Sequence, residues 1–151
     1  MKVLAVDYGE KKIGLAISDE LGIASVKLPV LQVKHERDKM EGIFFAIREF
    51  DPQLLLFGVP SSSSGGDSKQ AIDIKNFIEE FKKELHDNSE QRGIVNPPNI
   101  QTWDESFSTQ IAEKGKSRKF KKEKADSEAA RIFLQEFLES NFYKKQCCKE
   151  N

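Results

Sequence analysis

The chain has 151 residues and a formal net charge of −1, with 38% hydrophobic and 32% charged residues. This length suits one domain with a substantial core, and no apolar run approaches the roughly 18–20 residues of a membrane-spanning helix. Two adjacent cysteines, Cys147 and Cys148, are too few for a disulfide framework, so we expect a cytoplasmic protein without a secretion signal or membrane contact.

Three strands are predicted in the first part of the chain. Val3–Val6 is a continuous apolar run, typical of a strand covered on both faces, and Asp7 stands at its end. A short turn leads to a second strand at Ile13–Ser18, close enough in sequence for an antiparallel hairpin. A third extended segment covers Ala24–Val33, where Pro29 favours an edge or a bulge.

A helix and a strand follow. Apolar residues at three- and four-residue spacing across 40–50 predict one face of a helix, which Asp51 and Pro52 end. Leu54–Pro60 reads as a buried strand that stops at its proline. Because this strand follows a crossover helix, we expect it to pair parallel with an earlier strand.

The second half of the chain adds two helices and one strand. After the serine- and glycine-rich segment 61–66, Asp67 offers a cap for a helix with an apolar stripe across 71–85. Residues 87–99 read as a loop, in which 93–95 could begin a strand. A short strand at Ile100–Trp103 and a last helix at about Ala125–Ser140 complete the order βββ-α-β-α-β-α. The predicted fold class is therefore α/β, with a mixed five-stranded sheet flanked by helices.

Acidic residues stand at the ends of several predicted elements. Asp7 ends the first strand, Asp104 and Glu105 end the last strand, and Asp126 opens the last helix. Oxygen ligands of this kind favour Mg²⁺ or Mn²⁺ over zinc. Two such ions, about 3.5–4 Å apart, can activate water and stabilise the leaving oxygen of a phosphodiester. These acids are therefore the candidate catalytic residues of a metal site with one or, as we expect, two ions.

Each acid also has a structural interpretation. Asp7 could cap the glycine turn that follows it, and Asp126 could be the N-cap of its helix. Strand alternation lets only one of Asp104 and Glu105 face a cleft, and the longer Glu105 is the first choice. The two histidines, His35 and His86, lie in polar sequence beside helices and are expected to be exposed bystanders.

A basic segment contrasts with the rest of the chain. Residues 114–124 hold seven Lys or Arg and one Glu, a local charge of +6 that leaves −7 for the remainder. Such a concentration indicates contact with a polyanion, although a solvated loop is the alternative. Phe120 could stack on a base or anchor the core. The candidate nucleic-acid-binding residues of this segment are Lys116, Arg118, Lys119, Lys121 and Lys122.

Four motifs span most of the chain: VDYGEKKIGLAISD at 6–19, LLFGVP at 55–60, WDESFST at 103–109 and ADSEAARIFLQEFLE at 125–139. Together they resemble the YqgF/RuvX family of Holliday junction resolvases and pre-16S rRNA nucleases, which have a ribonuclease H-like fold. The resemblance implies a single nuclease domain at residues 1–141, followed by a polar tail at 142–151. It also implies that the metal ligands are Asp7, Glu105 (or its neighbour Asp104) and Asp126.

The chain departs from the family pattern at two places. The family usually has an arginine where this chain has Ser106, so a guanidinium near the scissile phosphate is absent. Lys11, Lys12 or the basic segment 114–124 could substitute as phosphate-binding groups, without the bidentate fork of arginine. The loop after Pro60 carries four serines in place of a hydrophobic-polar stretch. The hydroxyls of Ser108 and Thr109 could contact phosphate or begin a helix.

The leading functional hypothesis is a metal-dependent nuclease that acts in 5′-end processing of pre-16S rRNA, with Holliday junction resolution as the alternative. The expected partner is structured RNA or branched DNA, and the protein is expected to be a monomer or a homodimer. A non-catalytic nucleic-acid-binding module is a further alternative, motivated by Ser106. The Asp-x-Gly turn at residues 7–9 also occurs in ATPases of the actin class, but those enzymes pair two such domains, and this chain has room for one.

Overall fold

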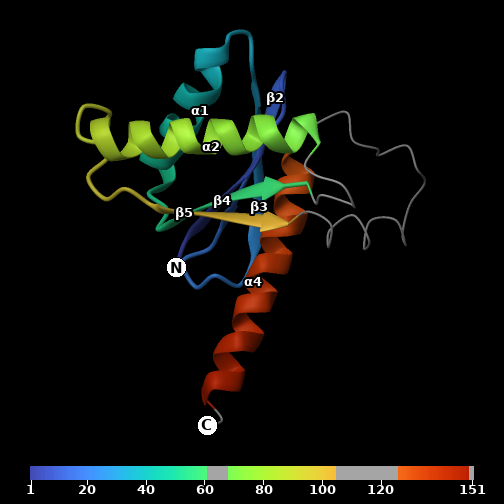
Figure 1. Cartoon of the computed structure of the whole chain (residues 1–151). Helices are drawn as coiled ribbons and strands as arrows, with labels where there is room; N and C mark the ends of the chain where they lie inside the picture. The colour runs from blue at the N-terminus through green and yellow to red at the C-terminus, as the bar shows by residue number, and fades with distance from the viewer. Residues whose placement is uncertain (61–67, 105–125, 150–151) are drawn as a thin grey trace.

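The computed structural model describes residues 1–60, 68–104 and 126–149 (Figure 1). Eight elements follow the predicted order along the chain. They are β1 (Val3–Asp7), β2 (Lys12–Ser18), β3 (Ser25–Gln32), α1 (Glu36–Phe50), β4 (Leu54–Val59), α2 (Lys69–Asn88), β5 (Asn99–Asp104) and α4 (Ser127–Lys149).

One mixed sheet forms the centre of the described structure, with the strand order β3-β2-β1-β4-β5. The short N-terminal connections give antiparallel pairs β1–β2 and β2–β3, whereas β4 pairs parallel with both β1 and β5. The predictions of an N-terminal hairpin and of a parallel strand after the crossover helix are confirmed. Since β1 and β4 are central, both faces of these strands are covered, which explains their continuous apolar sequences.

The sheet separates two hydrophobic cores. In β1, Leu4 and Val6 face α1 and α2, whereas Val3 and Ala5 face α4. Figure 1 shows this layering, with α2 in front of the sheet and α4 behind it. The side chain of Asp7 follows the alternation and lies on the α4 side of the sheet.

Two local predictions about the segment from 67 to 99 are wrong. The N-cap of α2 is Ser68, whose hydroxyl accepts the backbone N–H of Ala71 at 3.2 Å, and not Asp67. The segment 93–95 does not begin a strand, because Gly93 has a φ of +76° and Ile94 is buried in the core between the helices. When two neighbouring residues can both cap a helix, the sequence does not decide which one begins it. A short apolar run likewise does not show whether its residues form a strand or pack as a loop.

The last helix is longer than its apolar pattern indicates. The pattern predicts an end near Ser140, but α4 continues to Lys149 and takes in most of the segment expected to be a polar tail. None of the helices in the described part of the chain is both long and apolar enough to cross a membrane.

Candidate functional site

Asp7 stands at the end of β1, and its position depends on the beginning of α4. The side chain is buried, with 9% of its surface exposed, and its Oδ2 accepts the backbone N–H of Asp126 at 3.1 Å. The contact joins residues 119 positions apart, so two acids from opposite ends of the chain meet at one point. A central strand holds the first acid, and a docked helix holds the second.

A glycine in β2 allows this close approach. Gly14 pairs with Asp7 across the β1–β2 ladder. A Cβ atom at Gly14 would lie 2.1 Å from the carbonyl oxygen of Asp126, a distance that backbone atoms cannot tolerate. Next to it, the hydroxyl of Ser127 accepts the backbone N–H of Leu15 at 3.2 Å in a buried position. The beginning of α4 therefore packs directly on the backbone of β2.

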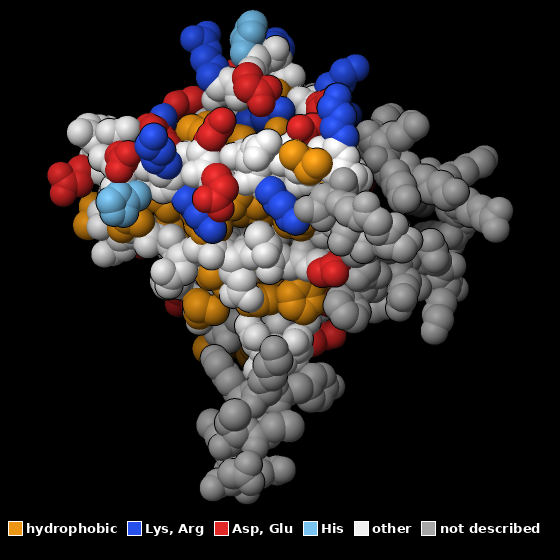
Figure 2. All heavy atoms as spheres, in the orientation of Figure 1, with side chains coloured by type: hydrophobic (Ala, Val, Ile, Leu, Met, Phe, Trp, Pro, Cys, Tyr) orange, Lys and Arg blue, Asp and Glu red, His pale blue; other side chains and the backbone are white. Residues whose placement is uncertain are grey.

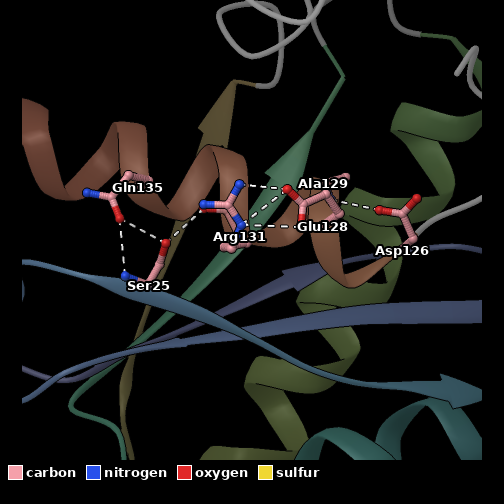
Figure 3. A network of polar contacts seen from close by, with 6 residues as sticks. All are labelled: Ser25, Asp126, Glu128, Ala129, Arg131 and Gln135. Atoms are coloured by element: carbon pink, nitrogen blue, oxygen red, sulfur yellow. Dashed lines mark hydrogen bonds and ion pairs between the residues drawn. The ribbon is translucent and has the colours of Figure 1, made fainter.

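Asp126 is the N-cap of α4. Its Oδ1 accepts the backbone N–H of Ala129 at 2.7 Å (Figure 3). Its carbonyl oxygen accepts the backbone N–H of Ala130 at 3.2 Å. The structural interpretation of this residue is therefore confirmed. The cap uses only one carboxylate oxygen, so capping does not exclude a second role for Oδ2.

Polar contacts fix α4 further along its length. The hydroxyl of Ser25 at the beginning of β3 donates to the carbonyl of Arg131 at 3.2 Å and to Oε1 of Gln135 at 2.9 Å (Figure 3). The backbone N–H of Ser25 also donates to that Oε1, at 3.1 Å. These bonds tie the helix to the edge strand and help to hold its N-terminus, with Asp126, in register with β1.

Asp104 lies at the end of β5, two strands away from β1. Ile100 packs on the core beneath α1 and α2, whereas Trp103 packs on the core beneath α4. By strand alternation, the exposed Asp104 belongs to the face opposite Asp7. The predicted site residue Glu105 lies outside the described residues, as do Ser106, Ser108, Thr109 and the basic segment 114–124.

Lys11 and Lys12, both predicted to contact nucleic acid, lie in the turn after β1 and at the beginning of β2. They line a groove that opens beside Tyr8, on the face of the sheet opposite α4. These two lysines are therefore close to the end of β1, but they line the face of the sheet opposite the one on which the side chain of Asp7 lies. His35 and His86 are both exposed, as predicted.

Comparison with known proteins identifies the family of this chain. A family model described as RuvX, Holliday junction resolvase, matches residues 1–140. The chain belongs to the RuvX family. A relative from Dictyoglomus turgidum, named as a pre-16S rRNA nuclease, is 36% identical over 93% of this chain and 95% of its own length. A relative of the same name from Desulforamulus reducens is 32% identical over 93% of this chain and 98% of its own.

Two solved structures of proteins with little sequence identity to this chain have a similar fold. Thermus thermophilus RuvC, solved in complex with a Holliday junction substrate, aligns with a TM-score of 0.55 at 11% identity, over 94% of this chain and 96% of that one. The fowlpox virus Holliday junction resolvase aligns with a TM-score of 0.50 at 14% identity, over 93% of this chain and 99% of that one. The fold is therefore ribonuclease H-like, and the chain belongs to a family of nucleases, hydrolases that act on ester bonds.

The donor atoms at this RuvX site fit a hard divalent cation. At the end of β1 the buried carboxylate of Asp7 accepts the backbone N–H of Asp126, a residue that carries a second carboxylate, and oxygen ligands are those that Mg²⁺ and Mn²⁺ prefer. Within residues 1–60, 68–104 and 126–149 no group of three or more His, Cys, Asp or Glu side chains is placed to hold a metal ion. The described part of the site therefore supplies two acids of the predicted set of three.

Sequence reasoning missed two residues that build this site, Gly14 and Ser127. A glycine inside an apolar strand signals the close approach of another backbone, and this signal was available at Gly14. Ser127 directly follows the N-cap residue Asp126, so its sequence position indicates only a residue of the first helical turn. Its bond to Leu15 becomes visible only once α4 is docked on β2.

Proposed function

We propose that this protein is a metal-dependent nuclease that hydrolyses phosphodiester bonds in 5′-end processing of pre-16S rRNA. The meeting of Asp7 and Asp126 at the end of a buried strand carries the proposal. The names of the relatives from Dictyoglomus turgidum and Desulforamulus reducens support this choice of substrate. We further propose that residues 1–141 act as one nuclease domain, in the cytoplasm, as a monomer or a homodimer.

Asp7, Glu105 and Asp126 would hold Mg²⁺ or Mn²⁺, most simply as two ions. Such ions supply activation of water and charge stabilisation at the phosphate. Glu105 is preferred over Asp104 as the third ligand, because Asp104 shares the parity of Ile100, which packs on the face of the sheet opposite Asp7. Asp7 is oriented by the N–H of Asp126, and this fixed carboxylate is what precise metal binding requires.

Basic side chains would bind the substrate backbone in this scheme. Lys11 and Lys12 flank the groove beside β1, and their charges suit phosphate contacts. Lys116, Arg118, Lys119, Lys121 and Lys122 are proposed to supply further phosphate contacts. Because Ser106 stands where the family usually has arginine, these lysines would act as point charges in place of a guanidinium fork.

A cleavage assay with two substrates tests the proposal. Purified protein with Mn²⁺ is expected to cleave an RNA that carries the 5′ end of precursor 16S rRNA. Asp7→Asn is expected to lower the rate by more than about a hundredfold. Mutating a residue that only hydrogen-bonds to a metal ligand costs about tenfold to a hundredfold, and changing a ligand itself should cost more. Asparagine keeps an oxygen that can accept the N–H of Asp126, so the melting temperature should change little. Unchanged cleavage by Asp7→Asn would show that the metal site lies elsewhere.

A matched pair of variants tests the third ligand. Glu105→Gln is expected to lose cleavage, whereas the neighbouring Asp104→Asn, whose side chain belongs to the opposite face, is expected to retain it. Retained cleavage in Glu105→Gln with loss in Asp104→Asn would reverse the assignment. Both substitutions remove one negative charge, so a general electrostatic effect cannot produce a difference between them.

Resolution of Holliday junctions is the second candidate function, favoured by the family description and by the fold shared with RuvC. In the same assay, preferred cleavage of a four-way DNA junction over the precursor RNA would select this alternative. Salt-sensitive binding of both substrates without turnover under Mg²⁺ or Mn²⁺ would instead support a non-catalytic binding module.

A further inference from the structure

A groove of about 910 Å³ lies on the side of the sheet opposite α4, and only Lys11 and Lys12 at one side of it have been given a role above. It runs between the turn after β1, the junction of β3 with α1, and one side of α2. In Figure 2 the upper part of the molecule, over the beginning of α1 and the beginning of β2, carries basic side chains beside acidic ones. The groove adjoins the candidate metal site, because Tyr8 lines it and directly follows Asp7.

Two buried polar side chains form the floor of the groove. Lys39 is 4% exposed and donates from Nζ to the hydroxyl oxygen of Tyr8 at 2.9 Å and to Oε1 of Glu36 at 3.1 Å. Burial alone would lower the pKa of Lys39, but these two hydrogen bonds outweigh it and raise the pKa, so the group is a cation at neutral pH. Lysine rarely becomes this buried without a partner or a role.

The hydroxyl group of Tyr8 faces the groove as a donor. Tyr8 is 6% exposed, and its oxygen is already used to accept from Lys39. Its own proton is not used in this bond, so it can be donated to an acceptor in the groove that Tyr8 lines. A hydroxyl donor and a buried ammonium group at one floor suit an anionic ligand with oxygen acceptors, such as a phosphate.

The two walls of the groove differ in charge. The wall made by the β1–β2 turn and the β3–α1 junction carries three lysines, Lys11, Lys12 and Lys34. It also carries Glu10 and Glu36, of which Glu36 is paired with Lys39. The wall made by α2 carries acidic and amide side chains, namely Asp73, Asn76 and Glu80. A nucleotide is complementary to these two walls. Its phosphate is anionic and suits the lysines, and the amino groups of its base can donate hydrogen bonds to carboxylate and amide oxygens. The first wall is also fixed in place, since the Asp38 carboxylate accepts the backbone N–H groups of Lys34 and His35 at 3.0 and 2.8 Å.

We propose that this groove binds nucleotides of the substrate strand next to the cleaved bond, with phosphates along the lysine wall and bases along α2. The inference rests on the proposed nuclease function and names a binding region for its substrate. The side chains of Asp7 and Tyr8 lie on opposite faces of β1, so the bound strand passes over the end of β1 from the metal site into the groove.

Binding of a fluorescent single-stranded oligonucleotide, measured by anisotropy over a series of salt concentrations without divalent ions, tests the groove separately from cleavage. Lys34→Ala is expected to weaken binding about threefold to tenfold and to reduce the slope of log K against log salt by about 0.7, the value for one phosphate contact on a single strand. Asn76→Ala is expected to weaken binding about threefold with an unchanged slope, because it removes one uncharged hydrogen bond.

Lys82→Ala is the matched control, since Lys82 is exposed on α2 outside the groove and pairs with Glu79 at 3.6 Å. It should leave both affinity and slope unchanged. Equal binding by wild type, Lys34→Ala and Asn76→Ala would overturn the proposal, and so would a wild type that does not bind the oligonucleotide. Displacement of the oligonucleotide by an equal concentration of a nucleoside monophosphate would also overturn it, because the ligand would then be a free nucleotide.

The same variants separate this inference from the nuclease proposal. If Asp7→Asn cleaves normally while Lys34→Ala and Asn76→Ala bind weakly, the metal site fails and the groove stands. If Asp7→Asn loses cleavage while the two groove variants bind as wild type, the groove fails and the metal site stands.

Discussion

The two faces of the sheet are built in different ways. Under α1 and α2, aromatic rings form a continuous core, with Phe44 and Phe81 stacked at 4.5 Å and Phe57 packed edge-on against Phe81 at 6.0 Å. Under α4 the core is smaller, and the beginning of the helix is held by polar bonds and a glycine contact with β2. The first face supplies most of the apolar burial, whereas the second sets the position of two acids. Stability and activity should therefore separate by face.

The largest effect is expected in the aromatic core. Phe81 is fully buried and contacts three other rings, so Phe81→Ala should lower the free energy of unfolding by about 4 kcal/mol. Denaturant titration measures this change. At a temperature where the variant stays folded, cleavage per folded molecule should match wild type, because Phe81 does not contact the α4 side. A large loss of cleavage in the folded fraction would mean that the two faces are coupled.

Gly14→Ala tests the α4 side with one methyl group. The added Cβ would meet the backbone of Asp126 at 2.1 Å, which neither β2 nor α4 can relieve by a rotamer change. We expect a loss of about 3 kcal/mol in unfolding free energy, at the upper end for overpacking, together with loss of cleavage. Denaturant titration and the cleavage assay measure the two effects.

Gly42→Ala is the control for this prediction. A Cβ at Gly42 in α1 would also be close to another atom, at 2.6 Å, but that atom is the mobile end of the Leu31 side chain. Helix propensity favours alanine at this position by up to about 1 kcal/mol, so the variant should be close to wild type in stability and cleavage. Equal losses in Gly14→Ala and Gly42→Ala would contradict the backbone clash.

The difference between the faces also explains what the sequence could predict. The order of elements, the antiparallel hairpin of β1 with β2 and the parallel pairing of β4 with an earlier strand follow from local periodicity and connection length, and these predictions are confirmed. The spacing of apolar residues across 71–85 also predicts which face of α2 is buried. These features depend on residues close together in the chain.

Long-range contacts account for what the sequence could not predict. The acids at 7 and 126 were singled out as possible ligands, but their direct contact depends on how α4 docks on Gly14, 112 residues before Asp126. Lys39 interrupts an apolar helical face and reads as a surface residue, yet it is buried because Tyr8 and Glu36 bind its ammonium group. Periodicity reports which face of an element is apolar, and it does not report which polar group will find a partner.

Asp126 allows capping and catalysis to be separated at one position. Asn caps helices about as well as Asp, so Asp126→Asn should keep the bond from Ala129 and change stability by only a few tenths of a kcal/mol. Asp126→Ala should cost about 1 kcal/mol. Both variants should lose cleavage, because neither retains the negative charge proposed to hold the metal. Normal cleavage by Asp126→Asn would restrict this residue to capping.

The smallest effect is expected at Glu136, further along α4. Its carboxylate oxygens are inaccessible to solvent, and neither makes a well-aligned hydrogen bond among the described residues. Burial and the nearby charge of Glu139 raise the pKa of Glu136 above 4.5, and the indole N–H of Trp103 offsets this only in part. The folded state therefore holds this proton more tightly than the unfolded chain does. Its contribution to stability must fall as the pH rises through the range above 4.5.

Glu136→Gln removes this titration without changing the shape of the side chain. The variant should be slightly more stable than wild type at pH 7, and the difference should disappear well below pH 4.5, where wild type is protonated in both states. Thermal unfolding of both proteins across this pH range measures the difference. Because none of the hydrogen bonds described above that hold Asp126 and α4 in place involves Glu136, cleavage at pH 7 should not change. A variant less stable than wild type at pH 7 would mean that the ionised carboxylate has a favourable partner in the folded protein.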